Sequence, residues 1–276
     1  MLICDAQVHI WAASSLERPW PQRHAPHREV PLGAGELLSE MDSAGVNRVV
    51  LVPPSWEGER NDLVLAAAHA HPDRFAAMGR IDPEEPGATQ RFERWLDRPG
   101  MLGLRLSVHR PGLREQITEG RIDWLWPLAE QRGIPLMILV SHPMMPLVDE
   151  VAQRHPGLKL VMDHCGLTHG KDEDAFREFD KLLAIAQRPN VAAKTSCFPY
   201  YTTDSYPYRK VHGYLRQVYD AFGPKRMFWG TDLSRLPCTY RQGVTMFTEE
   251  LPWLQGEDLE WVMGRGVCEW LGWKLP

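Results

Sequence analysis

The feature that most constrains the fold of this chain is a regular alternation of short apolar stretches with stretches of helical spacing. Leu37, Met41 and Ala44, for example, lie on one helix face, and Gly45 ends that helix before the apolar stretch 46–53. Strands are expected at 3–9, 46–53, 75–82, 102–108, 134–141, 158–164, 191–196 and 226–232. Strands separated by helices are expected to pair in parallel, because a parallel pair needs a long crossover connection.

About eight strands, each followed by a helix, predict an α/β fold of the (β/α)₈ type, a TIM barrel, and 276 residues are close to the usual size of that barrel. No linker, internal repeat or low-complexity segment interrupts the pattern, so a single domain is expected over residues 1–276. An open, doubly wound sheet has the same periodicity. Against that alternative, no glycine-rich phosphate-binding motif follows the first strand.

Composition narrows the classes of partner. A net charge of −5 and a pI near 6.1, with Lys and Arg scattered, give no basic field for nucleic acid. The chain has no run of 18 apolar residues and no charged-then-apolar leader, so a cytoplasmic protein that does not enter a membrane is expected. The five Cys residues lack CxxC spacing, which argues against a disulfide framework. The expected partner is a small molecule or a peptide, and self-association as a homo-oligomer is left open.

Polar side chains gather where the predicted strands end. Asp5, Gln7 and His9 alternate along the first strand and are expected to share one face. The later strand ends add Arg105, His109, Ser141, His142, Asp163, His164, Lys194, Ser196 and Asp232. Working residues of a barrel sit at the carboxyl ends of its strands, so these side chains are expected to converge on one mouth. Three imidazoles and a carboxylate there would suit a divalent ion of the zinc type.

Each candidate also has a purely structural interpretation. His9 can be a core histidine bonded to a backbone carbonyl, and His142, which precedes Pro143, can begin a loop. Lys194 lies inside an apolar run, so it faces the mouth, pairs with a carboxylate or lies on the outer face. Asp232 ends the last apolar strand, where a carboxylate that met only the core would be costly, and this favours a site role.

Six short motifs follow one another along the chain. They are D-x-Q-x-H-x-W at 5–11, HPDRF at 71–75, GLRL at 103–106, DHCG at 163–166, AKTS at 193–196 and WGTD at 229–232. In this order the chain resembles the amidohydrolase superfamily over essentially its whole length. It is most similar to the amidohydrolase 2 branch, which includes pyrone dicarboxylate lactonase, sugar-acid lactonases and carboxylate decarboxylases. The resemblance implies a distorted barrel with the active site at its mouth.

The first strand departs from the family pattern. Members usually carry H-x-H there, whereas this chain has Gln7 in place of the first histidine, and a neutral amide is a poor metal ligand. The resemblance implies one divalent ion, zinc in the first instance, held by His9, His142, His164 and Asp232. Some lactonases of this branch work without a metal, so metal-independent activity is the alternative.

The resemblance implies a hydrolase that opens a lactone, or a related cyclic ester of a carboxylated organic acid. Asp232 would deprotonate a water, while His9, His164 or a metal polarises the carbonyl. The two alternatives are a metal-dependent decarboxylase of an unsaturated or aromatic acid and a non-catalytic ligand-binding barrel.

Substrate binding is expected of side chains at the strand ends and in the loop 12–35. From the strand ends these are Gln7, Arg105, Ser141, Lys194 and Trp56, and from the loop they are Arg18, Arg23, His24 or His27. Planar guanidinium groups suit a substrate carboxylate. Trp56 can line an aromatic pocket, or it can belong to ordinary core packing.

Overall fold

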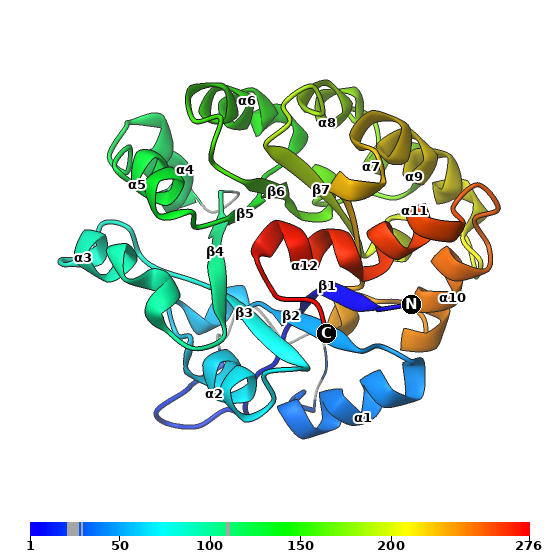
Figure 1. Ribbon diagram of the computed structural model, residues 1–276, viewed down its shortest axis with the longest axis horizontal. Coiled ribbons are helices and arrows are strands. Elements are labelled where there is room, and N and C mark those ends of the chain that lie inside the picture. Colours follow the sequence, from blue (N-terminus) through cyan, green and yellow to red (C-terminus); the bar gives the residue numbers. More distant parts are fainter. Residues whose placement is uncertain (21–27, 29, 109–110) are drawn as a thin grey trace.

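A computed structural model describes residues 1–20, 28, 30–108 and 111–276. Eight parallel strands follow one another in chain order around a ring (Figure 1). They are β1 (Cys4–Val8), β2 (Arg48–Leu51), β3 (Phe75–Gly79), β4 (Met101–Ser107), β5 (Leu136–Leu139), β6 (Leu160–Met162), β7 (Val191–Ser196) and β8 (Met227–Gly230). Each strand overlaps the stretch predicted for it, and the (β/α)₈ barrel is confirmed.

Most helices surround the ring of strands on its outside, and the last one lies across the ring (Figure 1). The helices are α1 (Ala34–Ala44), α2 (Asp62–Ala70), α3 (Ala88–Glu93), α4 (Pro111–Thr118), α5 (Leu125–Arg132), α6 (Met145–Arg154), α7 (Asp172–Ala175), α8 (Asp180–Ile185), α9 (Arg209–Phe222), α10 (Tyr240–Thr248), α11 (Gly256–Glu260) and α12 (Gly266–Leu271). The sequence did not predict α4, whose apolar positions are few. No helix in the described ranges combines the length and apolar character that crossing a membrane requires.

The inside of the barrel is filled with small and medium apolar side chains. The strands contribute Cys4, Ala6, Val50, Val52, Met78, Met137, Val161, Ala192 and Phe228. Three residues of α12, namely Val267, Cys268 and Leu271, pack against this inner cluster, and α12 lies across the ring in Figure 1. Because Cys4 begins β1, α12 covers the amino end of the barrel, and the carboxyl end is left for chemistry.

Strand alternation places polar side chains directly above this inner apolar layer. On β7, Val191 and Ala193 belong to the outer core beneath the helices, whereas Ala192 belongs to the inner cluster. Lys194, two residues beyond Ala192, points into the barrel and is completely buried. On β4, Leu102 packs on the inner cluster, and the buried Arg105, three residues further along the chain, bonds to Asp163, so a charged layer overlies the apolar one.

The seam between β1 and β8 is closed partly by a side chain. The amide of Asp232 donates to the carbonyl of Gln7 over 3.0 Å. The Oδ1 atom of Asp5 accepts from the amide of Thr231 at 2.9 Å and from that of Gln7 at 3.0 Å. Its Oδ2 accepts from the Thr231 hydroxyl and, at 2.9 Å, from the Tyr240 hydroxyl. The Asp5 carboxylate thus accepts the hydrogen bond from the Thr231 amide that a backbone carbonyl of the neighbouring strand would otherwise accept.

A register shift in β1 explains why Asp5 faces this seam. The pairing of β1 with β2 is irregular between Asp5 and Val8, as in a β-bulge, so simple alternation does not run through this stretch. Gln7 and His9 reach the barrel mouth, whereas Asp5 bonds to β8 and α10. The expectation that all three share one face is therefore wrong for Asp5.

Candidate active site

Two imidazoles, a carboxylate and an amide meet at the carboxyl end of the barrel. The Nε2 atom of His9 lies 3.2 Å from Oδ1 of Asp232, and Nε2 of His164 lies 3.9 Å from Oδ2 of the same carboxylate. The amide nitrogen of Gln7 is 3.3 Å from both imidazole Nε2 atoms. All four residues are buried. Four sequence-predicted residues, from β1 and from just beyond β6 and β8, therefore form one cluster.

A layer of paired charges lies beneath this cluster. The ammonium group of Lys194 is 2.6 Å from Oδ1 of Asp163 and donates to Oε1 of Gln7 over 2.6 Å. The Nε of Arg105 donates to Oδ2 of the same aspartate at 2.9 Å. Burial acts to raise the pKa of Asp163, but Lys194 and Arg105 outweigh it and lower that pKa to about 2. One ionised carboxylate therefore holds two cations in place.

Lys194 is a structural cation in this arrangement. Its side chain is 0% exposed, and it is enclosed by Gln7, Asp163 and the sulfur of Met137 at 3.3 Å. Burial is the largest influence on the pKa of Lys194 and lowers it, against the opposing effect of Asp163. The predicted substrate-binding lysine thus lies one layer below the mouth, where it supports Gln7.

The hydrogen bonds of the two imidazoles indicate their tautomers. A carbonyl can only accept, so Nδ1 of His9, which is 2.7 Å from the carbonyl of Val52, carries a proton. Nδ1 of His164 is 2.7 Å from the hydroxyl of Ser196. Burial lowers the pKa of His164 to about 4, so this ring is neutral at pH 7. With a Gln7 amide proton directed at Nε2, His164 places its own proton on Nδ1 and donates it to Ser196.

Asp232 is held in its ionised form. Burial acts to raise the pKa of this carboxyl, but His9, His164 and Arg235 together bring it well below its ordinary value. Asp232 also adopts a left-handed backbone conformation, with φ at 49°, in the turn that follows β8. A non-glycine residue held there at some conformational cost is typical of a functional position.

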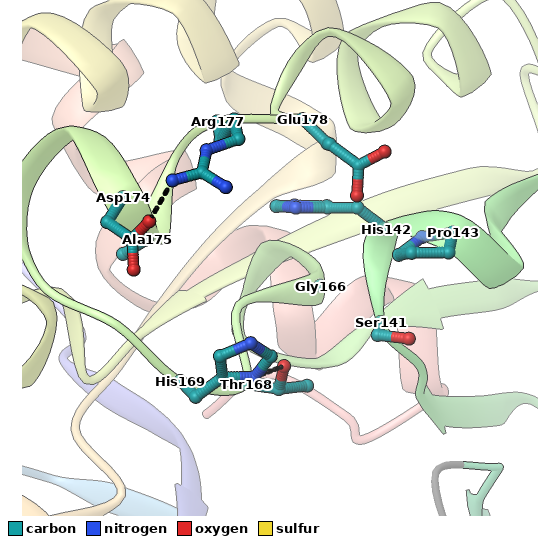
Figure 2. A pocket seen from close by; sticks show the side chains of 10 residues that line it. All are labelled: Ser141, His142, Pro143, Gly166, Thr168, His169, Asp174, Ala175, Arg177 and Glu178. Atoms are coloured by element: carbon teal, nitrogen blue, oxygen red, sulfur yellow. Dashed lines mark hydrogen bonds and ion pairs between the residues drawn. The ribbon is translucent and has the colours of Figure 1, made fainter.

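His142 and Ser141 line a pocket (Figure 2) that none of the four cluster residues lines. This cavity of about 300 Å³ is also lined by Thr168, Arg177 and Glu178. Nε2 of His142 contacts the carbonyl of Cys165 at 3.0 Å, and burial lowers the pKa of His142. The structure therefore does not bring His142 to the other three predicted metal ligands. The 3₁₀ turn η3 (His142–Met144) turns the chain away directly after β5.

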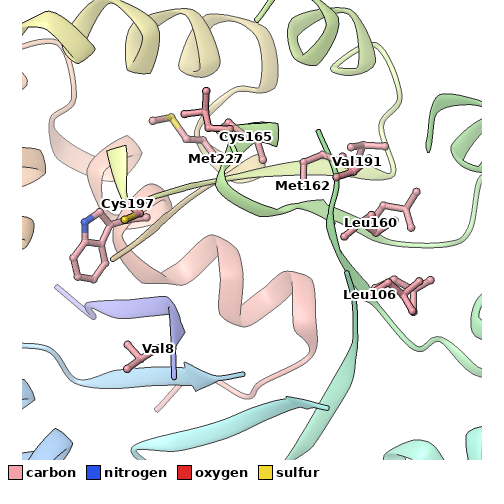
Figure 3. Close-up of a cluster of buried hydrophobic side chains, with 14 of the residues drawn as sticks. Val8, Leu106, Leu160, Met162, Cys165, Val191, Cys197 and Met227 are labelled. Carbon is pink, nitrogen blue, oxygen red and sulfur yellow. The ribbon is translucent and has the colours of Figure 1, made fainter. Parts of the chain in front are cut away.

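The contact from His142 supports the turn that presents His164. In η4 (Asp163–Gly166), His164, Cys165 and Gly166 have φ values of 51°, 54° and 76°. Such a run of left-handed residues is strained for side chains other than glycine. Its strain is offset by the contact of His142 with the Cys165 carbonyl and by burial of Cys165, which belongs to the hydrophobic cluster in Figure 3.

Arginines complete the polar layer at β3 and β4. Nη1 of Arg105 donates to the Ser107 hydroxyl at 2.8 Å, and Nη1 of Arg80 donates to the same hydroxyl at 3.0 Å. Both arginines are buried. Sequence reasoning passed over Arg80, although a charge at the end of the apolar stretch 75–82 is the same signal that marked Lys194.

Other predicted substrate residues have structural contacts. Trp56, in η1 (Ser55–Glu57), packs edge-on against Trp11 with ring centroids 5.8 Å apart. Arg18 is ion-paired with Glu57 and Asp62. The remaining loop and strand-end candidates lie outside the described residues; these are Arg23, His24, His27 and His109.

The donor set does not fit the divalent ion that the resemblance implies. Within the ranges that the structure covers, no group of three or more metal-ligating side chains is arranged to hold an ion. His9, His164 and Asp232 approach one another, but the Gln7 amide nitrogen is directed at both imidazole Nε2 atoms. These lone pairs are the ones a metal would need, and a lone pair that accepts a hydrogen bond is not free to coordinate.

The fold is a (β/α)₈ barrel, and two imidazoles, a carboxylate and an amide meet at the carboxyl end of its strands. These features define the class of (β/α)₈ hydrolases. Comparison with known families gives the same class, because the family model described as "Amidohydrolase" matches residues 4–265. The chain belongs to the amidohydrolase family.

Individual proteins similar to this chain include one curated relative and many solved structures. The L-fucono-1,5-lactonase of Burkholderia ambifaria is 26% identical over 244 residues, which are 84% of this chain and 81% of that protein. A zinc-bound amidohydrolase from Burkholderia multivorans has a TM-score of 0.84 at 19% identity, with all of both chains covered. A putative 2-pyrone-4,6-dicarboxylic acid hydrolase from Pseudomonas putida has a TM-score of 0.80 at 22% identity, covering 100% of this chain and 99% of that one. The two structures share the fold.

Proposed function

We propose that this protein is a hydrolase that opens a lactone, or a related cyclic ester of a small organic acid, with Asp232 as the acceptor of the proton of the attacking water. The observation that carries the proposal is the buried Asp232 carboxylate, which faces His9 and His164 at the mouth of an amidohydrolase barrel. Similarity to an L-fucono-1,5-lactonase over most of both chains supports the choice of a lactone as substrate.

The geometry supports a route in which Asp232 and His9 share the proton. A carboxylate with a pKa this low is a weak base by itself, and general bases work best with a pKa near the working pH. Nε2 of His9 carries a lone pair in the neutral ring and lies 3.2 Å from Asp232. A proton taken from water can therefore settle between the two groups, as an imidazolium paired with a carboxylate.

Lactone opening then follows in two steps. The hydroxide equivalent adds to the ester carbonyl, and its developing negative charge is met by the Gln7 N–H that Nε2 of His9 no longer accepts once His9 has taken up the proton. The ring carbon–oxygen bond then breaks, and the proton held by His9 and Asp232 passes to the departing alkoxide, which gives an open hydroxy acid. The donor arrangement described above contains no suitable divalent site, and none of these steps uses the zinc ion that the resemblance implies.

Substrate contacts are proposed for Gln7 in the cluster, Arg105 in the charged layer beneath it, Ser141 in the neighbouring pocket, and Trp56 beside Trp11. Arg105 is the most informative of them, because a guanidinium group can hold a carboxylate on the organic acid. Lys194 acts through Gln7 in this proposal, since it is enclosed below the mouth.

A panel of lactones tests the proposal. Purified protein is offered sugar δ- and γ-lactones and pyrone carboxylates, and release of acid is followed with a pH indicator and by chromatography of the hydroxy acid. Wild type is expected to hydrolyse at least one class, and Asp232→Asn is expected to lose turnover while keeping its circular dichroism spectrum. An Asn variant with full activity, or binding of panel members with no turnover by wild type, overturns the assignment.

A further inference from the structure

Gln7 connects the charged layer with both histidines. Its Oε1 accepts from the Lys194 ammonium at 2.6 Å, and its Nε2 is 3.3 Å from Nε2 of His9 and from Nε2 of His164. All four side chains are buried; Gln7 lies in β1, His9 follows β1, Lys194 lies in β7, and His164 lies in the turn after β6. One amide therefore makes three hydrogen-bonding contacts away from solvent.

The orientation of this amide is determined by Lys194. An ammonium group has three donors and no acceptor, so it can face only the oxygen of a carboxamide. Lys194 itself is fixed by Asp163 at 2.6 Å and lies against the sulfur of Met137. Rotating the Gln7 amide would bring its NH₂ group against a buried cation and its oxygen against the imidazoles. The NH₂ group is therefore held toward His9 and His164.

The two imidazoles present lone pairs to that NH₂ group. Nδ1 of His9 donates to the Val52 carbonyl, so Nε2 of the neutral ring carries a lone pair. This Nε2 lies 3.3 Å from the Gln7 amide nitrogen and 3.2 Å from Oδ1 of Asp232. Nδ1 of His164 is bonded to Ser196, so its Nε2 can accept in the same way. A donor with two protons placed between two ring lone pairs has the contacts that a bound cation would otherwise make.

We infer that the Gln7 amide, oriented by the Lys194 ammonium, replaces a divalent cation between His9 and His164 and holds both rings in their Nδ1–H tautomers. Gln7 and Lys194 are positioning residues in this arrangement, and the site rejects zinc although it keeps two imidazoles and a carboxylate. The inference concerns the same site as the proposed hydrolysis, but it depends only on the contacts just described.

Zinc binding without any substrate tests the inference. Wild type, Gln7→His and a matched control, Gln90→His on the exposed face of α3, are loaded with zinc and freed of excess by gel filtration, and metal is measured by mass spectrometry. Gln7→His adds a ligand and removes the blocking donor, so it is expected to retain one zinc and to bind it at least roughly 100-fold more tightly than wild type. Adding Asp232→Asn is expected to abolish the gain.

A second variant and a second readout guard against misfolding. Lys194→Met frees the Gln7 amide to turn its oxygen toward the mouth, so zinc affinity is expected to rise above that of wild type. Nitrogen-15 spectra of wild type are expected to show His9 and His164 as Nδ1–H tautomers at pH 7. The inference is overturned if wild type holds stoichiometric zinc that His9→Ala removes, if folded Gln7→His binds none, or if either ring is an Nε2–H tautomer. A lack of lactone turnover leaves these results unaffected.

Discussion

Nε2 of His9 lies 3.2 Å from Oδ1 of Asp232, and this contact spans the seam between the first and the last strand of the barrel. The amide of Asp232 donates to the carbonyl of Gln7 at the same seam, so backbone pairing fixes the distance between the two catalytic candidates. A pair held in this way is preorganised, since no loop has to close to bring its members together.

We expect His9→Gln to lower kcat by roughly 100-fold or more, the range measured for loss of a general acid–base group. Because His9 and Asp232 are proposed to share one proton, their effects should not add. Steady-state kinetics of His9→Gln, Asp232→Asn and the double variant check this. The double variant should be no slower than Asp232→Asn alone, and fully additive losses would contradict a shared proton.

Gly166→Ala is expected to lower both stability and activity. Gly166 has φ at 76°, and an added Cβ would lie 2.8 Å from Cδ2 of His142, so the turn that carries His164 must shift. The expected loss is about 1–3 kcal/mol in the free energy of unfolding. Urea denaturation measures it. Gly213→Ala in α9, where no atom lies within 4 Å of the added Cβ, is the control and should be neutral or slightly stabilising.

The pH dependence of stability should change in Asp5→Asn. Burial raises the pKa of Asp5 from 3.8 to about 6, so the folded chain holds this proton more tightly than the unfolded chain. The stabilisation from this proton is fully present below pH 3.8 and is lost as the pH rises through about 6. The Asn side chain does not ionise. Relative to wild type, the variant should therefore gain about 3 kcal/mol between roughly pH 4 and pH 7.

Denaturation of both proteins across this pH range is the measurement. The comparison with the variant is necessary because burial lowers the pKa of His164 to about 4. The stabilisation that neutral His164 gives the folded protein is therefore lost as the pH falls from 6.5 through about 4. This dependence on pH has the opposite sign to that of Asp5. Parallel stability curves for wild type and Asp5→Asn would show that the seam carboxylate does not titrate in this window.

Arg105→Lys tests the proposed substrate carboxylate. Arg105 is fixed by Asp163 and Ser107, and a lysine cannot reproduce both contacts and still present a planar pair of donors. For a carboxylated lactone KM should rise by about tenfold or more, equivalent to the 1.5–3 kcal/mol of a hydrogen bond to a charged group, while a neutral lactone is unaffected. Arg91→Lys on exposed α3 is the control. Equal effects on both lactones would indicate a structural role only.

The ends of the apolar stretches were sufficient to predict the barrel and most of the cluster. His9, His164 and Asp232 follow strands whose pairing is parallel and in chain order, so their convergence is a consequence of topology. The sequence pattern predicts the strand that each of these residues follows, and the closed order of the strands brings the three side chains together.

What could not be predicted depends on local backbone detail. The bulge in β1 turned Asp5 toward Thr231 and Tyr240, and strict alternation contains no information about such an irregularity. His142 leaves the mouth because a 3₁₀ turn begins at that residue. Lys194 was recognised as a buried charge, but its depth below Gln7 depends on how the layers stack inside the ring.

The helix across the amino end of the barrel has a kinetic consequence. Val267, Cys268 and Leu271 of α12 seal that end against the inner apolar cluster, so nothing passes through the ring of strands. Substrate and product therefore use the same opening, at the carboxyl end of the barrel. An opened acid that is slow to leave keeps the next lactone out, so we expect the product to inhibit the enzyme competitively as it accumulates.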